Sequence, residues 1–139
     1  MAKKAFALIL ALILLCSGLA GCSVSKTTIE ISATPRKYSP MMSSVQGIKL
    51  SITNPIEDED IVYVWKTTDG SFILGAGYDN VTEYTADSVL WSCVLSDTDN
   101  TVGEITKISV IAKNGKTGKE IAEASISIRR EELFYIVEE

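Results

Sequence analysis

Apolar residues alternate with polar ones along most of the chain beyond Lys26, and this period of two limits the possible folds. Successive side chains of a β-strand point to opposite faces, so the alternation is typical of strands with one buried face. No stretch keeps the i, i+3, i+4 spacing of an amphipathic helix over three turns. The apolar runs predict seven strands, at 29–31, 48–52, 61–66, 72–74, 89–94, 108–112 and 122–128. We therefore expect an all-β domain.

Turn-forming residues separate these runs at short intervals. They lie at Asn54-Pro55, Asp69-Gly70, Gly75 to Asn80, Asp97 to Gly103 and Asn114-Gly115. Asn114-Gly115 is the strongest hairpin signal, because both residues tolerate the positive φ of a two-residue type I′ turn. Seven short strands within about 105 residues predict a β-sandwich.

Five segments within this pattern resemble bacterial immunoglobulin-like and PKD-type domains. They are Tyr63-Val64-Trp65, Asp69-Gly70, Leu90-Trp91-Ser92, Ile105 to Ala112 and Ala124 to Ile128. The resemblance covers Ile48 to Arg129 and implies an immunoglobulin-like β-sandwich in which Trp65 fills the core between the sheets. The chain departs from the family at Val102-Gly103-Glu104, where Gly-x-Tyr is common, and this leaves the subfamily open.

The first residues have the pattern of a secretory signal peptide. Lys3 and Lys4 form a positively charged start, and Ala5 to Leu15 is an unbroken apolar run. A helix of that run is only ~16 Å long, which is too short for a hydrocarbon core of ~30 Å. A charged start, a short apolar run and small residues before a cleavage site are the parts of such a signal.

The junction after this run, Leu19-Ala20-Gly21-Cys22, resembles the lipobox of bacterial lipoproteins. In that family the cysteine thiol is acylated and the chain is cut just before it. The resemblance implies a signal peptide at 1–21, a lipidated Cys22 with a short linker at 22–26, and an immunoglobulin-like domain at 27–139. The other interpretation is an ordinary signal peptide with an accidental cysteine. Acyl chains gain ~0.8 kcal/mol per buried CH₂ and would anchor the protein to the extracytoplasmic face of a cell membrane or outer membrane.

Charge and composition narrow the functions open to the mature chain. Without Lys3 and Lys4, eleven basic residues remain against eighteen acidic ones, a net charge of −7 that argues against binding to nucleic acid. The sequence contains no histidine, the usual general base and the commonest metal ligand. We therefore expect neither an enzyme nor a resident cofactor or metal. Cys93 is the one cysteine outside the signal and the lipobox, and we expect it to be a buried free thiol.

Two acidic turns could supply oxygen ligands to calcium, one at Glu57 to Asp60 and the other at Asp97 to Asn100. Neither has the spacing of an EF-hand loop, and an immunoglobulin topology places them at opposite ends of the sandwich. We therefore favour solvated turns. Gly75-Ala76-Gly77 is a weak glycine-rich match that lacks the following helix of a phosphate site.

The tail from Glu131 to Glu139 contains five consecutive large apolar residues between acidic pairs. These are Leu133, Phe134, Tyr135, Ile136 and Val137. One interpretation is a further strand that packs on the sandwich. The other is an exposed edge that a partner extends by β-augmentation.

The short linker predicts which end of the domain faces the membrane, because Ser23 to Lys26 spans at most ~14 Å. In an immunoglobulin topology the first strand begins at the end that carries the acidic turn 57–60 and a basic turn. We expect the acidic turn to pair there with Lys113, Lys116 and Lys119. The opposite end would present the apolar tail and the loop from 35 to 44, with Tyr38, Met41 and Met42.

These observations favour a non-enzymatic, lipid-anchored interaction module of the bacterial cell envelope. Its partners would be the membrane, through acyl chains on Cys22, and an unknown protein or envelope component at the outward end. The alternative is a loop-based inhibitor of an extracellular peptidase.

Overall fold

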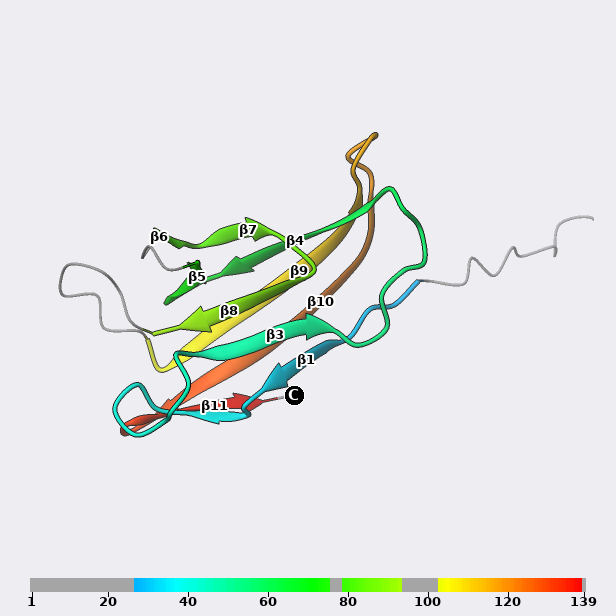
Figure 1. Cartoon of the computed structure of the whole chain (residues 1–139). Coiled ribbons are helices and arrows are strands. Elements are labelled where there is room, and N and C mark those ends of the chain that lie inside the picture. The colour runs from blue at the N-terminus through cyan, green and yellow to red at the C-terminus, as the bar shows by residue number, and fades with distance from the viewer. Residues whose placement is uncertain (1–26, 76–78, 94–102, 139) are drawn as a thin grey trace, which may run out of the picture.

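The computed structural model describes residues 27–75, 79–93 and 103–138, so the signal peptide and Cys22 lie outside the described residues. The described residues form an all-β fold of two antiparallel sheets with the core between them (Figure 1). The first sheet has the order β1 (Ile31–Thr34), β3 (Ile48–Ile52), β8 (Ser88–Ser92), β5 (Ser71–Leu74) and β6 (Asp79–Val81). The second has the order β2 (Lys37–Tyr38), β11 (Phe134–Glu138), β10 (Glu120–Glu131), β9 (Ile105–Asn114), β4 (Ile61–Thr67) and β7 (Glu83–Thr85).

Six of the predicted runs correspond to β3, β4, β5, β8, β9 and β10, whereas the run at 29–31 meets β1 only at Ile31. Three short strands that the sequence does not predict are β2, β6 and β7. They are two or three residues long, too short to show a period of two. β6 begins at Asp79, inside the segment expected to be a turn from Gly75 to Asn80, and that expectation is wrong for its last two residues.

Two tryptophans form the centre of the core. Trp65 on β4 and Trp91 on β8 come from different sheets, and each is fully buried. Each indole N–H donates a hydrogen bond to a backbone carbonyl. Trp65 Nε1 donates to Ala86 O at 2.8 Å, and Trp91 Nε1 donates to Asp69 O at 2.9 Å. The core position expected for Trp65 is therefore confirmed, and both rings are buried without an orphaned donor.

The hairpin between β9 and β10 is present, but its turn is not the expected two-residue type I′ turn. β9 ends at Asn114 and β10 begins only at Glu120. The positive φ of this turn falls on Gly118, at 72°. Asn114 Oδ1 instead accepts hydrogen bonds from the backbone N–H groups of Lys116 at 3.0 Å and Thr117 at 2.9 Å. The asparagine side chain thus stabilises a wider loop, as asparagine often does in turns.

The start of β1 lies at the same end of the sandwich as the acidic and basic turns. Ile31 pairs with Ile52, the last residue of β3, which leads into the acidic turn. Gly115 N donates to Asp60 O at 2.6 Å, and Lys116 Nζ lies 2.8 Å from Asp60 Oδ1. We call this the N-terminal end. The expected pairing of charges is confirmed for Lys116, whereas Lys113 pairs with Glu120 on β10.

The opposite end, which we call the far end, carries three features (Figure 1). They are the turn from 39 to 47, the start of β9, and the turn between β10 and β11. Tyr38 pairs with Tyr135 across β2 and β11, so the turn that follows Tyr38 lies beside Leu133. The backbone N–H of Arg130 donates to Glu104 O at 2.8 Å and brings the start of β9 to the same place. Asp97 to Asn100, also expected at this end, lies outside the described residues.

The apolar tail is a strand of the second sheet. The chain turns at Glu132, with a φ of 53°, and returns as β11 antiparallel to β10. β11 pairs with β2 on its other edge and buries the side chains of Tyr135 and Val137 in the core. The tail is therefore a packed strand, as in the first interpretation. Where β2 pairs with it, β11 offers no free edge to a partner.

Deleting residues 131–139 should therefore unfold the domain. The deletion separates β2 from its sheet and removes two buried side chains, and truncating even one buried aromatic residue costs about 3–5 kcal/mol. Since domains of this size are stable by only about 5–15 kcal/mol, we expect loss of the cooperative transition in urea, followed by circular dichroism. Leu133→Ser is the control. It changes an exposed side chain of the same segment and should shift stability by no more than about 0.5 kcal/mol. A truncated domain with an unchanged transition would contradict the role of β11.

Candidate functional site

Exposed large apolar side chains gather at the far end. Among the described residues, all of them except Tyr84 lie there: Met41, Met42, Val45, Ile105 and Leu133. Met41 and Met42 are the most exposed, at 79% and 68%. Exposed apolar side chains that gather at one end of a domain are more typical of an interaction site than single ones scattered over it. The far end is therefore the candidate site.

The structure divides the residues proposed for partner binding into two groups. Met41, Met42 and Leu133 are exposed, and Phe134 and Ile136 are half-buried on the outer side of β11. Tyr38, Tyr135 and Val137 belong to the core. Their burial corrects the expectation that these side chains are presented at the surface. It arises because β2 and β11 pair with each other, a long-range contact that alternation along the chain does not reveal.

Sequence reasoning missed Val45 and Ile105 as residues of the far end. Ile105 begins β9, where Thr106, Ile108, Val110 and Ala112 are buried. Side chains alternate along a strand, so Ile105 and Ile108, three residues apart, cannot both face the core. The odd spacing between Ile105 and Ile108 is therefore the sequence signal that could have placed the Ile105 side chain on the outer face. Val45 lies in a turn and carries no such signal.

A cluster of thiol and phenol groups around Cys93 lies near this end. The thiol is free and half-buried, which corrects the expectation of full burial. The ring of Tyr135 lies 5.5 Å from that of Trp91 in an edge-on arrangement and 6.4 Å from that of Tyr38. The Tyr38 hydroxyl donates to Gln46 O at 3.0 Å and ties this cluster to the far-end turn.

Burial governs the ionisation of this cluster. Burial raises the pKa of the Cys93 thiol, while a hydrogen bond from the Tyr135 hydroxyl and the charge of Arg130 lower it. Burial likewise raises the pKa of Tyr135 from 10.0 to about 12, with the hydrogen bond to Cys93 adding to the effect. A thiol with a raised pKa is mostly protonated at neutral pH and is a weak nucleophile. The cluster therefore suits packing better than thiol chemistry.

The acidic turn at the N-terminal end is occupied by protein contacts. Asp58 Oδ1 accepts the backbone N–H of Asp60 at 2.9 Å, and both Asp60 carboxylate oxygens face Lys116 Nζ, at 2.8 and 2.9 Å. Within residues 27–75, 79–93 and 103–138 there is no group of three or more acidic or cysteine side chains placed to hold a metal ion. In the same part of the chain, no helix is long and apolar enough to cross a membrane.

Comparison with known proteins identifies no relative. No protein-family model matches the chain, and no curated protein or solved structure matches it. The site must therefore be interpreted from its own residues.

Tyr135→Phe should make the domain more resistant to alkali. Because the pKa of Tyr135 is raised from 10.0 to about 12, folding favours the protonated phenol. This preference contributes fully to the free energy of unfolding below pH 10, and the contribution is lost as the pH rises towards 12. Phenylalanine keeps the buried ring but cannot ionise, so the free energy of unfolding should fall less between pH 10 and 12. Tyr38 and Cys93, whose pKa values burial also raises, contribute to the fall that remains.

Urea titrations at several pH values measure this difference. The control is Leu133→Ser, which changes an exposed side chain that does not titrate and should leave the profile unchanged. An identical pH profile for Tyr135→Phe and the wild type would contradict the assignment.

Proposed function

We propose that the chain is a lipid-anchored, extracytoplasmic interaction module of the bacterial cell envelope, without enzymatic activity. The observation that carries the proposal is the exposed apolar surface at the far end, at the opposite side of the domain from the start of β1. The lipobox-like Leu19-Ala20-Gly21-Cys22 supports an anchor through acyl chains on Cys22.

The sheet orders support an immunoglobulin-like type of sandwich. If the seven predicted strands are lettered A to G in chain order, β1, β3, β8 and β5 correspond to A, B, E and D. In the second sheet β4, β9 and β10 correspond to C, F and G. The sheets ABED and CFG are those of the constant-type immunoglobulin fold. The buried Trp65 on strand C agrees with that fold as well. On this interpretation β2, β6, β7 and β11 are additions at the sheet edges.

The geometry of the two ends supports an orientation on the membrane. Cys22 precedes the first described residue, Thr27, by only five positions, a reach of at most ~18 Å. The N-terminal end would therefore face the lipid, with the Asp60–Lys116 pair close to the surface. The far end would point outward, where Met41, Met42 and Leu133 are accessible.

The chemistry of the far end favours a protein partner. Methionine is flexible and polarisable, so two adjacent exposed methionines adapt well to an apolar surface on another protein. Exposed Glu104, Glu131 and Glu132 lie beside exposed Arg130 at this end, so the surroundings of the methionines carry charges of both signs. The loop-based peptidase inhibitor is the second candidate, since the turn from 39 to 47 presents both methionines at the tip of the domain.

Replacing both methionines should abolish partner capture without unfolding the domain. Met41→Ser with Met42→Ser truncates two exposed side chains, so stability should change by no more than about 0.5 kcal/mol. If each methionine is a binding hot spot that contributes about 2 kcal/mol, the double variant loses about 4 kcal/mol, and affinity should fall roughly a thousandfold. The measurement is the yield of a cross-linked envelope partner from a photoreactive side chain placed at Leu133.

The matched control is Glu123→Ser, on the outer face of β10 away from the far end. Unchanged cross-linking in the double methionine variant would contradict the proposed surface. Loss of inhibition of an extracellular peptidase in the same variant, with no stable envelope partner, would favour the inhibitor.

A further inference from the structure

Beyond Met1, the sequence contains only two methionines, Met41 and Met42, and both lie in the turn from 39 to 47 at the far end. Among the described residues, their side chains are the most exposed of the large apolar ones, at 79% and 68%. If the proposed signal peptide is removed, every thioether of the mature chain lies on the proposed binding surface. A reagent that attacks thioethers would therefore modify that surface and no other part of the chain.

Hydrogen bonds of the backbone and of hydroxyl groups fix this turn without help from either sulfur atom. Ser43 N donates to Ser39 O at 2.9 Å, and Ser39 N donates to Ser43 Oγ at 2.9 Å. The Tyr38 hydroxyl donates to Gln46 O at 3.0 Å and holds the other end of the turn. Because none of these bonds involves a methionine side chain, a chemical change at the sulfur atoms should leave the turn and the core intact.

Cys93 carries the other sulfur atom of the described residues, and its surroundings make it less reactive. Oxidants attack the thiolate form of cysteine, and burial raises the pKa of the half-buried Cys93 thiol. A thioether has no proton to lose, so its oxidation does not depend on a pKa. The exposure of Met41 and Met42 leaves their side chains open to solvent. An oxidant should therefore modify the two methionines before the thiol.

We propose that Met41 and Met42 form a reversible oxidation site that changes the far-end surface from apolar to polar. The oxidant is hydrogen peroxide or another hydroperoxide. The thioether sulfur attacks the terminal peroxide oxygen, and an S–O bond forms as the O–O bond breaks. The proton passes to the other oxygen, which leaves as water or an alcohol, and two electrons move from sulfur to the peroxide. A methionine sulfoxide reductase reverses the change, since two thiols become a disulfide and the oxygen leaves as water.

The consequence for binding rests on the proposed function, whereas the oxidation itself does not. A sulfoxide is a polar group with a hydrogen-bond acceptor, so it fits an apolar partner surface poorly. If the partner buries a sulfoxide without donating to it, affinity should fall about tenfold for each oxidised methionine. Oxidation would thus release the partner without unfolding the domain.

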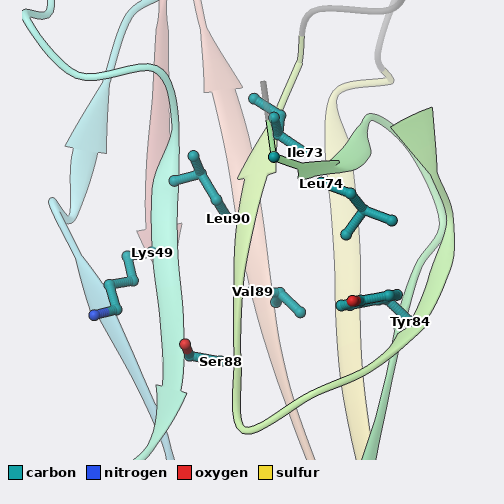
Figure 2. A pocket seen from close by; sticks show the side chains of 8 residues that line it. Lys49, Ile73, Leu74, Tyr84, Ser88, Val89 and Leu90 are labelled. Carbon is teal, nitrogen blue, oxygen red and sulfur yellow. The ribbon is translucent and has the colours of Figure 1, made fainter. Parts of the chain in front are cut away.

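A second surface of the domain serves as an internal control. It is an apolar depression of about 410 Å³ beside β8, and its described lining residues include no methionine or cysteine. Figure 2 shows Leu74 and Tyr84 across this depression from Val89. Peroxide should therefore shift the amide NMR signals of the turn from 39 to 47 and leave those of Leu74, Tyr84 and Val89 in place. Equal shifts at both surfaces would contradict a local change.

The first test follows the oxidation itself in the full chain treated with hydrogen peroxide. Trypsin should release residues 38–49 as one peptide that carries both methionines, and mass spectrometry of this peptide measures the oxygen gained. We expect Met41 and Met42 to be oxidised as fast in the folded protein as in the chain unfolded in urea, while Cys93 stays a thiol. Slow oxidation in the folded protein, or oxidation of Cys93 before the methionines, would overturn the proposal.

The second test measures partner capture by cross-linking from Leu133. The purified protein is oxidised, freed of peroxide and only then mixed with envelope extract, so that the partner meets no oxidant. The matched variant is Met41→Leu with Met42→Leu, which keeps the apolar volume but has no thioether. Peroxide should abolish capture by the wild type, and a methionine sulfoxide reductase with dithiothreitol should restore it. The leucine variant should capture the partner with or without peroxide treatment.

The outcomes separate this inference from the proposed function. If the wild type captures no partner before oxidation, the proposed function fails, and the first test still decides whether the oxidation site exists. Capture that survives complete oxidation of both methionines would overturn the proposed effect on binding. Loss of capture by the peroxide-treated leucine variant would also overturn it, because the sensitive group would then lie elsewhere in the chain.

Discussion

The burial of Trp65 and Trp91 between the two sheets is the interaction on which the rest of the structure depends. A buried aromatic side chain removes about 150–250 Å² from water, which corresponds to roughly 4–6 kcal/mol for each ring. Each indole N–H also donates to a carbonyl of a loop, Ala86 for Trp65 and Asp69 for Trp91, so the rings hold loops as well as strands in place. The described chain contains no disulfide, and this packing must supply the stability that cross-links provide in many small exported domains.

The rigid core separates two ends with different chemistry. The N-terminal end carries opposite charges that pair with each other across two turns, as Asp60 and Lys116 do. The far end carries exposed apolar side chains, among them Met41, Met42 and Leu133. β11 connects this end to the core, since Leu133 is exposed at its turn while Tyr135, two residues later, packs against Trp91. A partner at the far end would therefore rest on a surface fixed directly to the central core.

Alternation along the chain predicts seven of the strands, most clearly those such as β9 in which burial of one face imposes a period of two. It places Trp65 correctly for the same reason. It does not predict β2, β6 or β7, which are too short to have a period. Nor does alternation reveal that Tyr38 is buried, because this burial depends on the pairing of β2 with β11, which is distant in the sequence.

We propose that lipid on Cys22 holds this domain at a membrane, with its apolar far end directed outward. The decisive measurement is the intact mass of the protein, extracted with detergent from the envelope of the cells that produce it. We expect a chain that begins at Cys22 and is heavier than its polypeptide by a diacylglyceryl group, with or without a further acyl chain. A mature chain with an unmodified N-terminus, or one that still carries residues 1–21, would contradict it.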